Sequence, residues 1–456
     1  MRVGTLVLLC ALVAVAWSKP VWKEKNRGYK NYRLVRLSPT TQDQIDFLKR
    51  LENTVQLGID FWTPSDHPGT HNIDIAVPPK TYRTFIRLIE ANKITYKVIQ
   101  EDIQSLIDTE TTSNNKARED KIKSKACESQ GNSNWKGKGK NKCKNGQDAV
   151  ATFSNLATDS IVGTYARHGE INAWLDAVAA ESNGLATVET IGQTYEGKDM
   201  KVLKIGEDGT KPAIWVDAGI HAREWIAPAT LVYIIDKFLS EYNSLPELNK
   251  YTWYMLPVAN PDGYEYSHTS DRLWRKTRSP QSWGCRGVDP NRNWDSHFGE
   301  AGTSTFPCSD IYPGTGPFSE KCTQNIRDFI NEHKDRLKMY LSFHSYSELW
   351  LTPWGWGTEK PSDNAEMMRV ANLGKTAVQG INGKSWTVGA PPDILYAASG
   401  GSYDWAKEKA GIKYAYTLEL RPDGNASNGF VIPTSEILPS GKEVYAAVKK
   451  VASELI

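Results

Sequence analysis

The sequence predicts an α/β protein whose mixed sheet is covered by helices on both faces, preceded by a smaller α+β module. From about residue 157 to residue 456, segments with helical periodicity alternate with short apolar runs, which is typical of a sheet covered on both faces. Residues 32–102 instead show the order β-α-β-β-α-β. A long polar stretch separates the two parts, so we expect two folded units joined by a linker.

The N-terminal module is predicted to contain four strands and two helices. The strands are expected at 32–37, 59–63, 72–77 and 94–100, and the helices at 41–53 and 80–92. Each helix carries one apolar stripe: Ile45, Leu48 and Leu51 in the first, and Tyr82, Phe85, Leu88 and Ile89 in the second. One stripe per helix places both helices on one face of a four-stranded sheet, which is a ferredoxin-like arrangement.

The segment 106–156 is polar, rich in Gly and Lys, and lacks periodicity, so it is interpreted as a linker. Five lysines alternate with Gly, Asn and Cys near Trp135: Lys136, Lys138, Lys140, Lys142 and Lys144. They could bind a polyanion, but an exposed, protease-sensitive tether is the favoured interpretation. Cys127 and Cys143 are candidates to close a small loop within it.

The larger unit is predicted to alternate helices and strands. The helices are expected at 170–181, 226–239, 323–333, 364–379 and 435–455, and the strands at 201–204, 213–218, 253–258, 339–344 and 414–420. Binding sites in such sheets form beyond the carboxyl ends of the strands. His221 and His344 both fall at such ends, so we expect them at the site.

Residues 1–18 resemble a secretory signal peptide, with Arg2, an apolar run over 5–17 and small residues at 16 and 18. We expect the mature chain to begin near Lys19 and to be secreted. The apolar run is too short for an easy membrane span, and no later stretch is long enough. The formal charge of +2 in 456 residues gives no electrostatic case for binding nucleic acid or a membrane surface.

Secretion permits disulfide bonds. Once Cys10 leaves with the signal peptide, an odd set remains, so at least one cysteine stays outside intrachain pairing: Cys127, Cys143, Cys285, Cys308 and Cys322. The sequon Asn425-Ala426-Ser427 is a candidate site for an N-linked glycan. Sequons are commonly left unmodified, so Asn425 with and without a glycan are equally expected.

Two side chains that can bind metal, His221 and Glu224, follow an apolar strand in AIWVDAGIHAREW. A hydrolytic zinc site takes nitrogen and carboxylate ligands, usually three from the protein, and keeps one position open. His344 ends another apolar strand in KMYLSFHSYS and is the favoured third donor. Taken singly, each of these signals has an alternative interpretation without metal. His221 and Glu224 could be a solvated pair on a helix surface, and His344 could be a hydrogen-bonded structural histidine.

Glu419 lies on a strand whose alternation places Tyr414, Tyr416 and Leu418 on one face. Glu419 shares the other face with the small residues Ala415 and Thr417, which is unusual for a core position. Either it forms a salt bridge, for instance with Arg421, or it acts as a general base beside the metal.

From about Thr158 to Ile456 the chain resembles the secreted zinc metallocarboxypeptidases of the pancreatic A/B type, and the N-terminal module resembles their propeptide. The motifs, in the order of the family, are HAREW at 221–225, NPDGY at 260–264, RLWRKTRS at 272–279, VDPNRNWD at 288–295, HSYS at 344–347, YAASGGSYDW at 396–405 and TLELR at 417–421. The implied organisation is a signal peptide over 1–18, a propeptide over 19–105, a linker over 106–156 and a catalytic domain over 157–456.

The resemblance implies one zinc ion held by His221, Glu224 and His344, with Asp289 orienting His221. It implies that Glu419 is the general base, which takes a proton from the attacking water and passes it to the leaving amine. Arg275 is implied to stabilise the oxyanion.

The remaining roles implied by the resemblance concern substrate binding and one disulfide. Asn291 and Arg292 would hold the C-terminal carboxylate, for which a planar guanidinium is well suited. The other implied substrate contacts are Arg223, the mobile Tyr396, Tyr346 in the neighbouring subsite and Tyr403 at the floor of the side-chain pocket. Cys285 and Cys308 would form a disulfide, whereas Cys322 has no implied partner.

Three features depart from the family pattern. The linker is long and contains its own cysteine pair, so the resemblance does not place the activation cut. Tyr403 stands where A-type enzymes carry an apolar residue and B-type enzymes an acid. Pro422 follows Arg421 at a bond that is cis in the family, and proline makes a cis bond less costly.

We therefore expect the secreted zymogen of a monomeric zinc carboxypeptidase, activated by a trypsin-like protease and acting in extracellular digestion. Tyr403, Gly355, Pro391 and Gly401 supply no acid, so apolar or aromatic C-terminal residues should be preferred. Asp393 is the main threat to this expectation, because it lies close in sequence to Tyr396 and could turn into the pocket and accept a basic residue. The rival class, a binding protein on an inactivated enzyme fold, is disfavoured because the implied ligands, base and clamp are all present.

Overall fold

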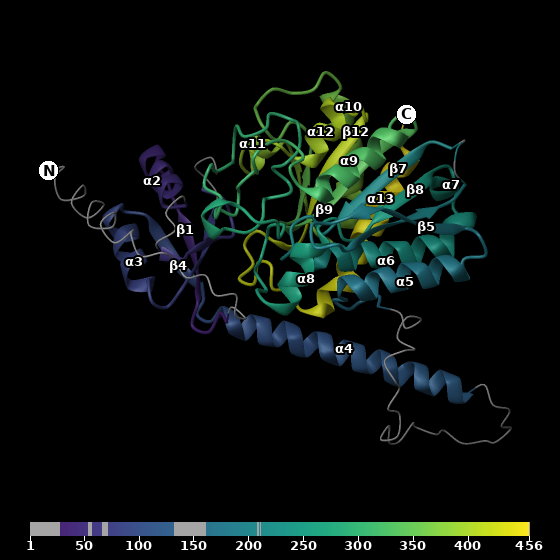
Figure 1. Ribbon diagram of the computed structural model, residues 1–456, viewed down its shortest axis with the longest axis horizontal. Coiled ribbons are helices and arrows are strands. Elements are labelled where there is room, and N and C mark those ends of the chain that lie inside the picture. Colours follow the sequence, from purple (N-terminus) through teal and green to yellow (C-terminus); the bar gives the residue numbers. More distant parts are fainter. Residues whose placement is uncertain are drawn as a thin grey trace.

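The computed structural model describes residues 28–52, 57–65, 72–131, 161–207, 209 and 211–455 (Figure 1). The predicted signal peptide, Cys143 and the lysines at 136–144 lie outside these residues. Among the described helices, none is long and apolar enough to cross a membrane.

The N-terminal module has the predicted order of elements. They are β1 (Arg33–Ser38), α2 (Gln42–Glu52), β2 (Asp60–Phe61), β3 (Ile73–Val77), α3 (Tyr82–Ala91) and β4 (Thr95–Gln100). The strands form an antiparallel sheet in the order β2-β3-β1-β4. The predicted apolar stripes pack on one face of this sheet, where Val35, Ile75, Leu48 and Phe85 share a core.

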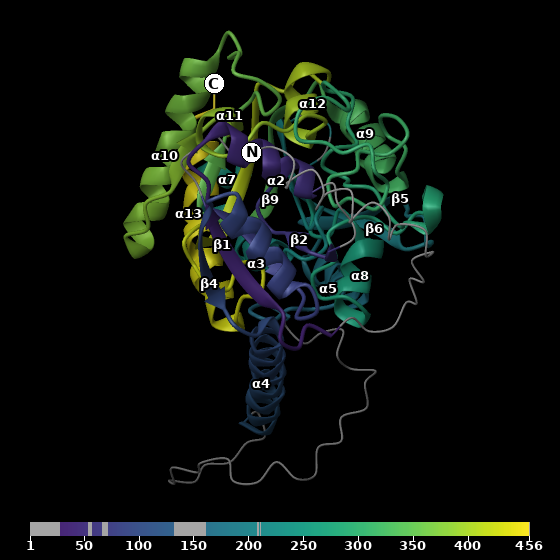
Figure 2. The ribbon, with the colours of Figure 1, turned by 90° about the vertical axis from the view of Figure 1, so that its left-hand side faces the viewer.

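The other face of this small sheet packs against the larger domain. Leu34 and Ala76 point to this face, and together with Trp62 they form a cluster with Tyr346 and Phe430 of the larger domain. In Figure 2, which views the molecule from the side of the module, β1 and β4 lie in front of the larger domain. The sheet is therefore buried on both faces.

The prediction of an irregular linker from residue 106 is wrong for its first half. Helix α4 spans Ile103–Gly131 and extends along the larger domain (Figure 1). Its sequence has no apolar stripe, but residues such as Ala, Arg, Glu, Lys and Gln favour helix without one. The helix is anchored near its start, where the buried Glu110 accepts hydrogen bonds from Arg272 at 2.6 and 2.8 Å.

The larger domain is built on an eight-stranded mixed sheet in the order β11-β10-β12-β9-β7-β8-β6-β5. The strands are β5 (Ala186–Gln193), β6 (Asp199–Ile205), β7 (Ala213–Ala218), β8 (Thr252–Leu256), β9 (Leu337–Ser347), β10 (Leu349–Leu351), β11 (Thr387–Gly389) and β12 (Tyr414–Asp423). The four central strands, β12, β9, β7 and β8, are parallel. The sequence prediction missed the edge strands β5 and β11, and also β10, which lies between β11 and β12.

Helices cover both faces of this sheet, as predicted. They are α5 (His168–Glu181), α6 (Ile226–Glu241), α7 (Pro246–Asn249), α8 (Pro261–Thr269), α9 (Lys321–His333), α10 (Asn364–Asn382), α11 (Pro391–Ile394), α12 (Ser402–Glu408) and α13 (Ile437–Ser453). Ile214 and Val216 of β7 join the core beneath α5, α6, α10 and α13. Trp215, between them in the chain, packs with α9 and α12 on the opposite face. The alternation along the strand thus produces two cores.

The implied disulfide between Cys285 and Cys308 is present, with Cα atoms 4.9 Å apart. Cys322 is a buried free cysteine in α9. The Arg421–Pro422 bond is cis. The loop of the sequon leaves Asn425 exposed, and Arg36 of the N-terminal module donates hydrogen bonds to the carbonyls of Gly424, Asn425 and Ala426.

Candidate active site

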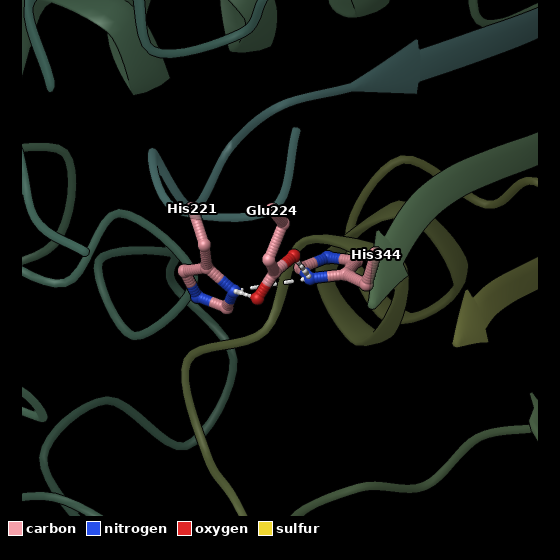
Figure 3. A group of neighbouring side chains, drawn as sticks. All are labelled: His221, Glu224 and His344. Carbon is pink, nitrogen blue, oxygen red and sulfur yellow. Dashed lines mark hydrogen bonds and ion pairs between the residues drawn. The ribbon is translucent and has the colours of Figure 1, made fainter. Parts of the chain in front are cut away.

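Three side chains that can hold a metal ion converge where β7 and β9 end (Figure 3). Nδ1 of His221 lies 2.8 Å from Oε1 of Glu224. Nδ1 of His344 lies 3.1 Å from Nδ1 of His221 and 3.1 Å from Oε2 of Glu224. All three residues are buried. Side chains separated by about 120 positions in the sequence therefore present their donor atoms to one point.

The backbone explains this convergence. Strand β7 ends at Ala218, and the chain turns at Gly219, whose φ of 66° favours glycine. A Cβ there would lie 2.8 Å from the ring of Pro228 in α6. His221 and Glu224 follow in the loop before α6. His344 lies on the neighbouring parallel strand β9, and the amide of Ser345 donates to Oε2 of Glu224 at 3.2 Å.

The donor set fits zinc. Two imidazole nitrogens and one carboxylate are a common set of three protein ligands for catalytic zinc, which leaves a further position for a ligand from solution. Nε2 of His221 lies 3.1 Å from Oδ1 of Asp289, an arrangement that turns Nδ1 toward the other two donors. Burial lowers the pKa of His221, which favours the neutral imidazole that a metal requires.

Asp289 also binds Arg275. Nη2 of Arg275 donates to Oδ2 of Asp289 at 2.9 Å, and Nε donates to the same oxygen at 3.1 Å. The amide of Asn291 donates to Oδ1 at 2.9 Å. Burial opposes ionisation of Asp289, but Arg275 and His221 outweigh it and hold the pKa of this carboxyl well below its usual range. One carboxylate thus orients both His221 and Arg275.

Glu419 lies opposite His344 in the register between β12 and β9. Its side chain leaves the face occupied by Tyr414, Tyr416 and Leu418, as the alternation predicted. Burial raises the pKa of Glu419 to about 8, while nearby His344 opposes the rise. A divalent cation bound beside this carboxyl would lower its pKa. Arg421 pairs with Glu436 and Glu443, so it is not the partner of Glu419.

Two cavities meet at this point. The first, called the capped cavity, is lined by Trp62, Thr63 and Pro64 of the N-terminal module and by His221, Glu224, Arg275, Tyr346, Tyr396, Glu419 and Phe430 of the larger domain, among others. The second, called the tyrosine cavity, is lined by His221, Asn291, Arg292, Leu351, Pro391, Leu395, Tyr396, Ala398, Gly401, Tyr403, Thr417 and Glu419. The space between these residues, including the part that is open to solvent, is about 430 Å³.

Of the other residues named from the sequence, Tyr346 and Tyr396 line these cavities, whereas Arg223 lines neither. Tyr396 lines both of them. The hydroxyl of Tyr346 donates to Asp74 of the module at 3.1 Å. Arg223 is buried under the module, and its Nη1 donates to Asp60 at 3.1 Å.

The sequence did not predict that residues of the N-terminal module take part in the site. Nothing local marks Asp60, Trp62, Thr63 or Pro64 as residues of a cleft, because their partners are more than 150 positions away in the chain. Thr417, which lines the tyrosine cavity, was predicted only as a small residue on the same face as Glu419. Its position on the same strand face as Glu419 was the one feature of the sequence that indicated a place in the site.

Comparisons with known proteins agree with the fold and the site. A family model described as zinc carboxypeptidase matches residues 171–447, and one described as carboxypeptidase activation peptide matches residues 35–110. Carboxypeptidase B of Astacus astacus is 48% identical over 294 residues, which cover 64% of this chain and 96% of that protein. Carboxypeptidase A2 of Rattus norvegicus is 37% identical over 424 residues, 92% of each. The crystal structure of carboxypeptidase A from Helicoverpa armigera aligns with a TM-score of 0.78 and 27% identity, covering 93% of this chain and 97% of that one.

The fold and the three converging donors define a metal-dependent hydrolase with an N-terminal module over its cleft. The chain belongs to the zinc carboxypeptidase family. It is the zymogen of a metallocarboxypeptidase: zinc is its cofactor, peptide C-termini are its substrates, and removal of the activation peptide by proteolysis is its route to activity.

Proposed function

We propose that this zymogen is secreted and is activated by a trypsin-like protease, yielding a monomeric exopeptidase that serves extracellular digestion. We further propose that it removes apolar or aromatic C-terminal residues in preference to basic ones. The observation that carries this preference is the tyrosine cavity, which lies beside an arginine with an unused donor and contains no acid except Glu419.

Recognition of a free C-terminus is assigned to Arg292 and Asn291. Nε of Arg292 donates to the carbonyl of Gly302 at 2.9 Å, and Nη1 donates to the carbonyl of Asn291 at 3.0 Å. Nη2 is buried without a hydrogen-bond partner of ordinary geometry among the described residues. Oδ1 of Asn291 accepts from the amide of Ser402 at 3.0 Å, which leaves its NH₂ group to donate. A substrate carboxylate would satisfy both donors, and Tyr396 would close over it.

The chemistry is assigned to Glu419 and Arg275. Bound zinc would supply Lewis-acid chemistry, polarising the scissile carbonyl and lowering the pKa of water. Glu419 accepts the proton of the attacking water and transfers it to the leaving amine. Arg275, held by Asp289, donates hydrogen bonds to the negative charge that develops on the carbonyl oxygen.

The neutral character of the side-chain pocket rests on where nearby acids point. Asp393, the main threat to the sequence-based prediction, is exposed and accepts a hydrogen bond from Lys360 at 2.6 Å. Asp404 follows Tyr403 but accepts from the amide of Gly355 at 2.9 Å and does not line the cavity. Glu419 is then the one described carboxylate that lines the cavity, and it is assigned to the chemistry. A buried Lys or Arg side chain without a carboxylate of its own would cost several kcal/mol.

A basic preference is the alternative, because the relative from Astacus astacus is named carboxypeptidase B. We expect the activated enzyme to have a higher kcat/KM for peptides ending in Phe, Leu or Ala than for peptides ending in Lys or Arg, by about tenfold or more. Steady-state kinetics on such a series would measure this. A tenfold advantage for Lys or Arg would exclude the proposed preference.

Latency is assigned to the segment of the N-terminal module that caps the cleft. Asp60 pairs with Arg223, and the carbonyl of Phe61 accepts from Nη2 of Arg223 at 3.4 Å. The ring of Trp62 lies 5.3 Å from that of Phe430. A peptide that approached His221 and Glu419 through the capped cavity would meet Trp62, Thr63 and Pro64.

We expect the uncut precursor to be nearly inactive and trypsin to release its activity. Asp60→Ala should raise the residual turnover of the uncut protein, because it removes the carboxylate that pairs with Arg223. Turnover of one peptide by cut and uncut forms measures both effects. Glu101→Ala is the matched control, since Glu101 pairs with Arg33 inside the module and is exposed. Equal turnover before and after cleavage would refute the assignment.

The activating cut is expected beyond α4. Lys116, Arg118, Lys121 and Lys123 lie within the helix, whose hydrogen-bonded backbone is a poor protease substrate, and Arg118 pairs with Glu170. The lysines at 136–144 are therefore the favoured sites, and N-terminal sequencing of the trypsin product identifies the bond cut.

A further inference from the structure

Two hydroxyl groups of the tyrosine cavity have no hydrogen-bond partner among the described residues. They are Oη of Tyr403 and Oγ1 of Thr417. Their residues are 5% and 2% exposed, so neither hydroxyl is a surface group with free access to bulk water. Buried polar groups are paired in the great majority of cases, and two orphans in one ligand cavity indicate that a ligand pairs with them.

The two hydroxyls come from different elements. Tyr403 lies in the first turn of α12, and a Cβ on Gly355 would collide with its hydroxyl, so the side chain reaches across to the Gly355 backbone. Thr417 lies on β12, two residues before Glu419 and on the same face of the strand. Leu351, Pro391 and Ala398 complete the lining with apolar groups. Arg292 and Glu419 are the lining residues of this cavity that carry formal charge, and the two hydroxyls lie among neutral groups that are not uniformly apolar.

Binding an apolar side chain in such a cavity has a cost. Any water that pairs with the hydroxyls in the free enzyme is displaced, and an apolar group gives them nothing in return. A neutral side chain with a hydrogen-bonding end replaces the lost partner. A cationic side chain would instead bring a charge for which Glu419, assigned to the chemistry, is the one carboxylate among the described lining residues.

We infer that the side-chain pocket selects neutral C-terminal residues that carry a hydrogen-bonding group, in preference to apolar residues of the same shape, and that Tyr403 and Thr417 determine this selectivity. This inference rests on the proposed function and refines it: the substrates are peptides ending in residues such as Gln, Asn or Tyr.

Matched pairs of substrates test the inference, because the two members of each pair have nearly the same size. Peptides ending in Gln and Met, Asn and Leu, or Tyr and Phe would be compared on the activated wild-type enzyme. The polar member of at least one pair should have a kcat/KM about tenfold higher, the difference expected when one buried hydroxyl keeps its partner. If the apolar member wins in all three pairs, the inference is wrong.

Two variants locate the effect. Tyr403→Phe and Thr417→Val each remove one hydroxyl with little change of shape, and each should lower the polar-to-apolar ratio severalfold. Tyr165→Phe removes another buried hydroxyl that also has no hydrogen-bond partner among the described residues but does not line the cavity. It should leave the ratio unchanged. A ratio that stays at the wild-type value in both pocket variants would overturn the role of the hydroxyls. If one variant folds poorly, an unchanged ratio in the other would overturn the role of the hydroxyl that it removes.

The outcome for this inference is separable from that for the proposed function. A preference for Lys or Arg would refute both. A preference for Phe, Leu and Met over their polar counterparts, with Lys and Arg poor, would refute the inference alone and leave the apolar specificity standing.

Discussion

Replacing Glu419 by Gln is expected to lower the kcat of the activated enzyme by about a thousandfold while its zinc content stays unchanged. Glutamine keeps the shape of the side chain but cannot accept the proton of the attacking water. Glu419 lines both cavities and lies opposite His344 on β9, so no other described carboxylate except the ligand Glu224 lines this point. Turnover of one peptide and metal content per chain would be measured on the same preparations.

Glu366→Gln is the matched control for this variant. Glu366 lies on α10, where it pairs with Arg369 and accepts from the hydroxyl of Tyr414, away from both cavities. The turnover of the Glu366→Gln enzyme should match that of the wild type. If Glu419→Gln retained more than about a tenth of wild-type turnover, Glu419 would not be the general base.

Replacing His344 by Ala is expected to remove zinc and, with it, hydrolysis. Nδ1 of His344 is one of the three donors that converge at the end of the sheet among the described residues, so two protein ligands remain. Loss of a group that merely orients a ligand typically costs 10- to 100-fold in metal affinity, and loss of a ligand should cost at least about 100-fold. Metal content after dialysis measures this loss, as does the zinc concentration needed to restore activity.

Chelation of the wild-type enzyme should have the same effect and should be reversed by added zinc. His297→Ala is the control, because His297 lies outside the site, where it pairs with Glu300 and stacks on Trp356. This variant should keep one zinc per chain. Full activity of the metal-free wild-type enzyme would rule out the proposed chemistry.

Much of the fold could be predicted because periodicity is local. The alternation along β12 separates Tyr416 from Thr417 whatever the rest of the chain does, and the stripes of α2 and α3 identify their buried faces. The edge strand β5 was missed because Ala186 is the one buried residue among its eight, so it carries no apolar run. Helix α4 was missed because no apolar stripe runs along its length; the apolar residues that pack, Ile103, Leu106 and Ile107, lie in its first turns.

The site was only partly predictable, because sequence patterns are local and the contacts between distant segments are not. His221, Glu224 and His344 were recognisable because each follows or ends an apolar strand, and parallel strands bring their carboxyl ends together. Tyr403 was identified as a pocket residue by its place in a motif. The motif does not show that its hydroxyl lacks a partner, because that depends on how α12 packs against Gly355 and β12.

The sequence by itself determined the class of fold, the order of elements in the N-terminal module, the metal donors and the family. Only the tertiary structure decided that Asp60 pairs with Arg223, that Glu110 pairs with Arg272, and that Asp393 turns away to Lys360. Periodicity and motifs are properties of neighbouring residues, so they can be recognised along the chain. The pairings of Asp60 in the N-terminal module and of Glu110 in α4 each span about 160 positions. They depend on which faces of folded segments come into contact, which no local pattern records.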